Sequence, residues 1–317
     1  MRRNIKNAVK AVLPPFLYAV LRRMTTGFSG QSEDRNGLTV QEYWTGHNVT
    51  NHRVFASAEE SLENFYWRSE QYINYLNLMP VTGYDGKIVL DFGCGPGHDL
   101  VGFGFFSKPA RLIGYDVSAS SLAEAGQRLK LHGIEAQLIA GGGGADIPLD
   151  DAAVDVIHSS GVLHHVEDLP AILREFRRIL KPGGEMRIMV YNYDSIFVHL
   201  YVPYILQIEQ GLHAGLNLDD AFSRCTDGEF CPVSIAYRPE AFIALAREHG
   251  FAGGFSGAAV SMLEARLCAK RFDAIAEQRL EREHRLFLLD LTFDERGLPL
   301  YNGAYAGLDG CYRFVRE

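Results

Sequence analysis

Three short stretches of the chain carry residue types that bind charged ligands or exchange protons. The first covers residues 88–98, Ile-Val-Leu-Asp-Phe-Gly-Cys-Gly-Pro-Gly-His, in which an apolar run ends at Asp91 and glycines follow at alternate positions. Glycine has no Cβ, so the backbone of such a turn can approach a ligand closely. In the dinucleotide fingerprint G-x-G-x-x-G, a glycine would stand where this chain has His98. The stretch predicts a ligand-binding turn between a buried strand and a helix.

The second stretch is a predicted strand at residues 111–116 that ends in Asp116. Doubly wound folds place an acid at this point that accepts hydrogen bonds from the hydroxyls of a ribose. The ordinary alternative for such an aspartate is the N-cap of the next helix. The distance of Asp116 from the glycine turn favours the ribose role.

The third stretch holds two adjacent histidines, His164 and His165, after a predicted strand at residues 154–159. An imidazole can take a proton near neutral pH, so both are predicted catalytic residues, with His165 ahead of His164. The alternative is that one or both pack or bond to the backbone. Their spacing is not that of a helical metal site, and we predict no metal.

Strand and helix patterns alternate along the chain, which predicts an α/β fold with a doubly wound, seven-stranded and mostly parallel sheet. Ligands bind beyond the carboxyl ends of the strands in such sheets. The strands are expected at residues 88–91, 111–116, 135–140, 154–159, 186–191, near 255–262 and at 310–315.

Composition narrows the class of protein. The 317 residues are 47% hydrophobic and 22% charged, which indicates a globular chain able to bury a full core. A formal net charge of −8 argues against a nucleic-acid surface. The five cysteines form no C-x-x-C pair, so we expect a reducing, cytoplasmic setting and no disulfide framework.

The N-terminal residues 1–24 carry basic and apolar side chains and no acid. This pattern is typical of an amphipathic element on an anionic membrane surface, which makes peripheral membrane contact one hypothesis. The other is an arm that packs on its own domain or on the partner subunit of a homodimer. The apolar run at residues 11–21 is too short to span a bilayer.

Four ordered motifs together carry a family resemblance. They are residues 89–97, residues 114–118 (Gly-Tyr-Asp-Val-Ser), residues 163–165 (Leu-His-His) and residues 180–184 (Leu-Lys-Pro-Gly-Gly). In this combination the chain resembles the class I S-adenosylmethionine-dependent methyltransferases. Within them it is most similar to the small-molecule group that includes the ubiquinone and menaquinone methyltransferases.

The resemblance implies S-adenosyl-L-methionine as the cofactor and a Rossmann-like core. It implies that Asp91, Gly93 and Gly95 hold the methionine end, Asp116 the ribose and Val117 one face of the adenine. The family often places an acid after the third strand for the adenine amine, where this chain has Gly141–Gly144; Asp146 is the candidate substitute. The remaining predicted cofactor residues are Cys94, Gly97, Ile147 and Ser160.

The same reasoning divides the chain into five parts. An arm and linker (1–40) and a helical cap (41–84) precede the S-adenosylmethionine-binding core (85–194). A helical lid insertion follows the fifth strand (195–238), and residues 239–317 complete the sheet with added helices.

Substrate choice is expected at the lid, because an insertion after a late strand can cover the acceptor pocket. Dimer contact or extra core is the alternative for this insertion, and a pocket under the aromatic residues before the first strand is the alternative place for the acceptor. The predicted substrate-binding residues are Tyr191, Asn192, Tyr201, Arg224, Asp227, Tyr43 and Trp44.

The predicted function is methyl transfer to a small organic acceptor, at oxygen in preference to nitrogen or carbon. The acceptor is expected to be a polar metabolite or a glycan- or lipid-linked molecule. One rival is a catalytically silent methyltransferase-like partner protein. A second is a nicotinamide-dependent oxidoreductase, which the glycine spacing disfavours.

Overall fold

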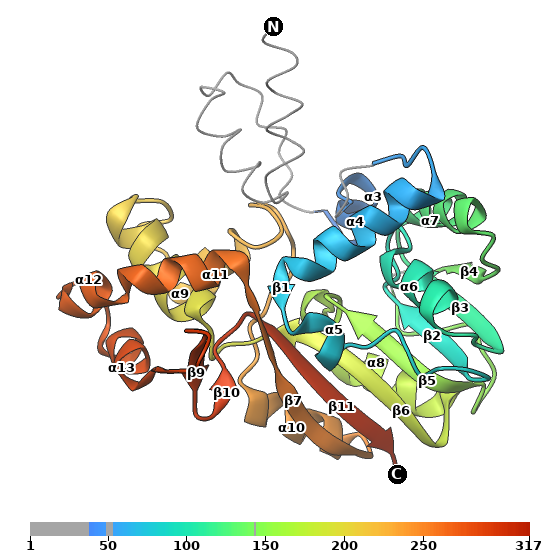
Figure 1. The fold of residues 1–317 in the computed structure, drawn as a ribbon. Helices are drawn as coiled ribbons and strands as arrows, with labels where there is room; N and C mark the ends of the chain where they lie inside the picture. The colour runs from blue at the N-terminus through green and yellow to red at the C-terminus, as the bar shows by residue number, and fades with distance from the viewer. Residues whose placement is uncertain (1–37, 49–52, 143) are drawn as a thin grey trace, which may run out of the picture.

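The computed structural model describes residues 38–48, 53–142 and 144–317, and one large sheet runs through it (Figure 1). The strand order is β1-β7-β11-β6-β5-β2-β3-β4. The predicted basic arm at residues 1–24 lies outside the described residues. The strands of this sheet are β1 (Tyr72–Ile73), β2 (Ile88–Phe92), β3 (Arg111–Asp116), β4 (Gln137–Ala140), β5 (Val154–Ser160), β6 (Leu180–Tyr191), β7 (Phe251–Ser261) and β11 (Asp309–Arg316).

The predicted fold class is confirmed, with one correction to the strand count. Strands β2 to β6 pair in parallel, and β11 lies antiparallel between β6 and β7. The sheet has eight strands because the short β1 adds to the edge of β7, with Tyr72 opposite Ser261. Strand β6 also begins at Leu180, before the predicted start at 186, because Leu180 already pairs with Val154.

Helices cover both faces of the parallel part, and their ends follow local sequence signals. Ser57, Ser118 and Asp168 each cap a helix by accepting a hydrogen bond from a backbone N–H in its first turn. The helices around the large sheet are α3 (Val40–Gly46), α4 (Ala58–Glu70), α5 (Tyr75–Leu78), α6 (His98–Phe106), α7 (Ala119–His132), the 3₁₀ helix η1 (Leu163–His165), α8 (Leu169–Ile179) and α10 (Pro239–Glu248).

The sheet core forms where apolar strands meet the inner faces of the helices. In α8 the predicted stripe is buried as expected: Leu169, Ile172, Leu173, Phe176 and Ile179. These side chains pack against Leu90, Ile113, Ile157 and Ile188 of four neighbouring strands.

A second core lies beside the sheet (Figure 1). It joins the insertion after β6 to helices from the C-terminal part of the chain, so the insertion packs as part of a helical layer. Its elements are η2 (Phe197–Glu209), α9 (Leu218–Ser223), α11 (Met262–Leu267), η3 (Cys268–Lys270), α12 (Arg271–Ala276) and α13 (Arg282–Asp290), with a small sheet of β8 (Thr292–Phe293), β9 (Pro299–Tyr301) and β10 (Ala304–Tyr305).

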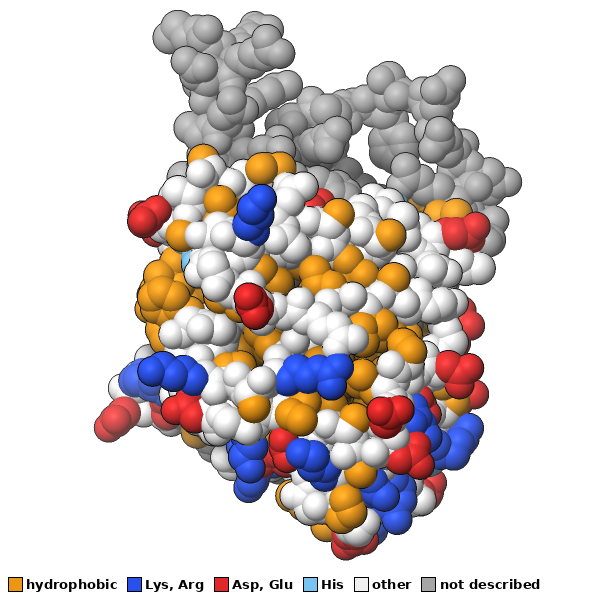
Figure 2. All heavy atoms as spheres, turned by 90° about the vertical axis from the view of Figure 1, so that its right-hand side faces the viewer, with side chains coloured by type: hydrophobic (Ala, Val, Ile, Leu, Met, Phe, Trp, Pro, Cys, Tyr) orange, Lys and Arg blue, Asp and Glu red, His pale blue; other side chains and the backbone are white. Residues whose placement is uncertain are grey.

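The surface of the described residues carries both charged and hydrophobic side chains. On the face that Figure 2 presents, side chains of both charges alternate over the lower part and hydrophobic side chains form a band across the middle. Among the described helices, none combines the length and apolar character that crossing a membrane requires.

Candidate cofactor and acceptor site

The glycine turn lies between β2 and α6 at the carboxyl edge of the sheet. Gly93, Gly95 and Gly97 have φ angles of 76°, 50° and 77°, the left-handed region that glycine tolerates best. A Cβ at Gly93 would lie 2.2 Å from a methyl carbon of Val162, whereas one at Gly95 would meet no atom within 4 Å. The turn is therefore tightly packed below and open above, as a ligand cradle requires.

Asp116 fixes this turn from the neighbouring strand. Its Oδ2 accepts from the backbone N–H of Gly95 and its Oδ1 from that of Ser118, both at 2.8 Å. The N-cap of α7 is Ser118, so the alternative reading of Asp116 as the helix cap does not describe the structure. Burial raises the pKa of Asp116, and the backbone hydrogen bonds oppose that shift. Each carboxylate oxygen keeps a lone pair for a ligand hydroxyl.

Asp91 is buried beneath the turn with an unsatisfied acceptor. Its Oδ2 has no hydrogen-bond partner among the described residues. Burial raises the pKa of Asp91 to about 8, with Asp99 and Asp116 acting in the same direction. A buried acceptor without a partner costs stability, so this oxygen suits the ammonium group of a ligand.

Asp99 and His158 complete a buried group around Asp91 that the sequence analysis missed. His158 Nε2 lies 3.1 Å from Asp99 Oδ2. Burial disfavours the charged histidine, but the bond to Asp99 outweighs it and raises the pKa of His158. No spacing signal marks this pair, because the two residues come from α6 and the middle of β5.

Arg68 of α4 is a further residue that sequence reasoning did not find. Its partly exposed guanidinium forms no hydrogen bond or ion pair with the described residues, while its charge acts on Asp91 and Asp99. A cation whose charge acts on this buried group is suited to the carboxylate of a ligand. Arg68 lies in an aromatic helix far from the glycine motif in sequence, so no sequence pattern pointed to it.

The other predicted cofactor residues lie around the same edge. Val117 is partly exposed beyond β3, and Cys94 is buried in the turn. Ile147 is buried, and its N–H donates to Glu175 at 2.9 Å, whereas Asp146 beside it is exposed. Ser160 forms a hydrogen bond with the hydroxyl of Tyr75 in α5.

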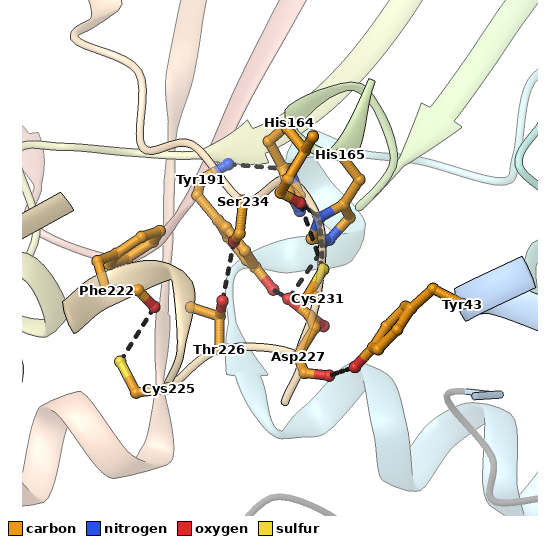
Figure 3. Close-up of polar contacts among 11 residues, drawn as sticks. Tyr43, His164, His165, Tyr191, Phe222, Cys225, Thr226, Asp227, Cys231 and Ser234 are labelled. Carbon is orange, nitrogen blue, oxygen red and sulfur yellow. Dashed lines mark hydrogen bonds and ion pairs between the residues drawn. The ribbon is translucent and has the colours of Figure 1, made fainter. Parts of the chain in front are cut away.

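The acceptor half is centred on an ion pair between His165 and Asp227 (Figure 3). His165 Nε2 lies 3.3 Å from Asp227 Oδ2, and its Nδ1 lies 2.6 Å from the carbonyl of Val233. Burial works against the charge of His165, but Asp227 outweighs it and raises the pKa of His165 to about 10. Despite burial, the same pair lowers the pKa of Asp227 to about 2. His165 is thus protonated at neutral pH, with both ring nitrogens donating.

His164 is held in the neutral form. Its Nδ1 accepts from the N–H of Tyr191 at 3.2 Å, and its ring stacks on that of Tyr191 with centroids 3.7 Å apart. Burial lowers the pKa of His164 well below the usual range. Its proton is therefore on Nε2, a buried atom without a partner among the described residues.

Two trios of side chains bring metal-type ligand atoms within 4.8 Å of one another. They are His164, His165 and Asp227, and Asp91, Asp99 and His158. In the first trio His165 and Asp227 already form the ion pair described above. The expectation of no metal stays a prediction for both trios.

Three elements distant in sequence meet at the loop that carries Asp227. Tyr191 donates its hydroxyl to Asp227 Oδ2 at 2.7 Å, and Tyr43 of α3 donates to the Asp227 carbonyl at 2.6 Å (Figure 3). Trp44 lies against His165, with ring centroids 4.9 Å apart. Residues from both predicted places for the acceptor, the lid insertion and the N-terminal aromatics, thus lie together around Asp227.

Three predicted acceptor residues lie elsewhere. Tyr201 is buried in the second core beside Phe197, and Arg224 is exposed at the end of α9. The side-chain amide of Asn192 is buried and donates to the carbonyls of Asp194 and Gly307, both at 3.0 Å. The structure does not bring these side chains to the ion pair.

The fold and the glycine turn define a class I S-adenosylmethionine-dependent methyltransferase core. Residues 90–188 match the family model described as a methyltransferase domain. The chain therefore contains a methyltransferase domain of this class, and S-adenosylmethionine is the cofactor of that domain.

Curated relatives match over the same region. A 37.1 kDa protein of transposon TN4556 from Streptomyces fradiae is 36% identical over 115 residues, 36% of this chain and 32% of that protein. The malonyl-[acyl-carrier protein] O-methyltransferase of Xylella fastidiosa is 31% identical over 110 residues, 35% of this chain and 37% of that protein.

The ubiquinone biosynthesis O-methyltransferase of Pseudomonas aeruginosa is 30% identical over 143 residues, 42% of this chain and 58% of that protein. The chain thus spans between about a third and somewhat over half of the length of these relatives. The acceptor-side elements after β6 lie beyond the matched domain.

Proposed function

We propose that the protein transfers the methyl group of S-adenosylmethionine to an oxygen of a small organic acceptor. The observation that carries the proposal is the cradle itself. It combines an open glycine turn with an Asp91 oxygen and an Arg68 guanidinium that have no polar partner among the described residues. These groups complement a zwitterionic amino acid attached to a nucleoside.

Each part of the cofactor has residues that fit it. Asp91 binds the ammonium group and Arg68 the carboxylate, while the backbone of Gly93 and Gly95 lies along the methionine chain. Asp116 accepts from the ribose hydroxyls. Further binding contacts are assigned to Cys94, Gly97, Val117, Asp146, Ile147 and Ser160, with Val117 and Asp146 at the adenine.

The cofactor supplies an electrophilic methyl group on a sulfonium. The protein has to hold the acceptor in line with that group and to exclude water. Trp44, Tyr43 and Tyr191 provide the aromatic walls, and the His165–Asp227 pair joins the loop at residues 226–234 to the sheet edge. We propose this loop as the acceptor lid, in place of the whole insertion.

Transfer to oxygen is supported by the relatives, two of which are named as O-methyltransferases. The described site also has an aromatic and hydrogen-bonding character that suits a small organic molecule. Two further proposals depend on residues 1–24. If they contact a membrane, a glycan- or lipid-linked acceptor is favoured, and if they pack on a partner subunit, the protein is a homodimer. Cosedimentation of the full chain with anionic vesicles tests the first, and its mass in solution tests the second.

Calorimetry with S-adenosylhomocysteine, and NADH as the comparison ligand, tests the proposed cofactor. We expect binding of the first and none of the second, which also separates the nicotinamide rival. Transfer of label from methyl-labelled S-adenosylmethionine to a deproteinised cell extract then separates an enzyme from a silent partner protein. Absence of S-adenosylhomocysteine binding would overturn the proposal.

A further inference from the structure

The antiparallel strand β11 brings its first residue, not its last, to the ligand-binding edge of the sheet. Asp309 begins β11 and lies opposite Tyr191 at the end of β6. On its other side it lies opposite Ala259, near the end of β7. The sequence analysis considered residues that follow parallel strands, and it therefore did not find an acid that begins an antiparallel strand.

Asp309 is 3% exposed, and its carboxylate forms no hydrogen bond with the described residues. The charged groups that act on it are Asp227 of the lid loop, Glu264 of α11 and Arg68 of α4. Desolvation raises the pKa of Tyr72 (β1), Tyr75 (α5) and Tyr191 (β6), and the charge of Asp309 adds to this effect, so all three are neutral phenols.

The neighbours of Asp309 place it between the two halves of the site. Arg68 acts on both Asp91 and Asp309, and Tyr75 acts with Asp309, with Asp99 and, through a hydrogen bond, with Ser160. Tyr191 links it to Asp227. Asp309 therefore begins its strand at the sheet edge next to Tyr191, whose hydroxyl bonds to Asp227 of the lid loop.

We infer that Asp309 is the base that takes the proton of the acceptor, and that the acceptor group is a hydroxyl and not a carboxylate. The inference rests on the proposed function and names its substrate class. As the acceptor oxygen forms its bond to the methyl carbon, the carbon–sulfur bond breaks with its electron pair kept by sulfur. The hydroxyl proton passes to the Asp309 carboxylate, which balances the charge.

The histidines of the site are less suited to this step. His165 already carries a proton on each ring nitrogen, because Nε2 donates to Asp227 and Nδ1 donates to the Val233 carbonyl. The Nδ1 lone pair of His164 is occupied by the N–H of Tyr191. Burial raises the pKa of Asp309 well above the usual range, with Glu264 and Asp227 adding to the effect, so its carboxylate is a stronger base than an exposed one.

A carboxylate acceptor does not match this environment. It has no proton to lose at neutral pH, and the buried Asp309 carboxylate would repel its charge. A hydroxyl donates to Asp309 and satisfies a buried carboxylate that has no hydrogen bond with the part of the chain that the structure describes.

The test follows label from methyl-labelled S-adenosylmethionine into a deproteinised cell extract. Mild alkali hydrolyses methyl esters to volatile methanol but leaves methyl ethers intact, so we expect alkali-stable product from the wild type. Asp309→Asn should lower transfer by about 10²-fold or more, the usual contribution of a general base. Its affinity for S-adenosylhomocysteine should stay within about twofold, as binding alone needs no base.

Asp290→Asn, an exposed acid on α13, is the matched control and should transfer label as the wild type does. Alkali-labile label, or undiminished transfer by Asp309→Asn, would overturn the inference while leaving the proposed function intact. The alkali result comes from the wild type and stays decisive if the variant does not fold. Cofactor binding without any labelled product would instead overturn the proposed function and this inference with it.

Discussion

The two halves of the site differ in how far their polar groups are already satisfied. In the cofactor half, neither the buried Asp91 oxygen nor the Arg68 guanidinium has a polar partner among the described residues. In the acceptor half, His165, Asp227 and Tyr191 bond to one another. The cofactor half is therefore prepared for a charged ligand, whereas the ion pair of the acceptor half is a support whose charges cancel and which leaves Asp309 for the acceptor.

Breaking the ion pair is expected to have the largest effect. Asp227→Ala leaves His165 buried without its counter-charge, and breaking one side of a buried pair costs about 3–5 kcal/mol. Chemical denaturation should show this loss in the free energy of unfolding, and methyl transfer should fall as well. Arg224→Ala, an exposed change close to the same loop, is the control and should alter neither. Unchanged stability of Asp227→Ala would mean that the pair does not support the lid.

A change in the cofactor half should affect binding and spare the lid. Asp116→Ala removes the acceptor of the ribose hydroxyls, at about 1.5–3 kcal/mol for each charge-assisted bond, or at least about tenfold in affinity. It also frees the N–H groups of Gly95 and Ser118. Calorimetry with S-adenosylhomocysteine measures the loss. Full affinity in this variant would show that Asp116 serves only the turn.

The pH dependence of stability separates the halves in a different way. The pKa of His165 is raised to about 10, so its contribution is complete below its ordinary value near 6.5 and is lost as pH rises toward 10. The free energy of unfolding of the wild type should fall by at least about 1.4 kcal/mol between pH 6.5 and 10 through this group. In Asp227→Asn the decline should be smaller. Parallel pH curves for the two proteins would contradict the ion pair.

Arg68 offers the sharpest test within the cofactor half. Arg68→Ala should lower the affinity for S-adenosylhomocysteine by about tenfold, the equivalent of one charge-assisted hydrogen bond. The affinity for methylthioadenosine should not change, because that ligand lacks the amino-acid carboxylate. Competition calorimetry compares the two ligands on the same variant. Equal weakening of both would place Arg68 away from the methionine end.

Sequence reasoning reached the cofactor half more fully than the acceptor half. The glycine turn and Asp116 are contiguous with strands of strong apolar pattern, so their place at the sheet edge followed from the pattern of alternation. Asp99, His158 and Arg68 were missed because their meeting depends on how α4, α6 and β5 pack. The meeting of Tyr43 with Asp227 joins residues 184 positions apart, which local patterns do not encode.

The lid insertion shows a second limit. Its apolar residues predicted a helix, which the structure has as η2, but could not tell a roof over the acceptor from a second core. Tyr201 packs in that core, whereas Asp227 reaches the ion pair. Asp309 was hidden for a topological reason, since only the antiparallel direction of β11 brings its first residue to the site.

The most direct test of the difference between the halves is the affinity for S-adenosylhomocysteine of the wild type, Asp116→Ala and Asp227→Ala, measured by calorimetry under one condition. We predict binding by the wild type, at least about tenfold weaker binding by Asp116→Ala, and an affinity within about twofold of the wild type for Asp227→Ala. Failure of the wild type to bind, or equal weakening by the two variants, would contradict the division of the site into a cofactor half and an acceptor half.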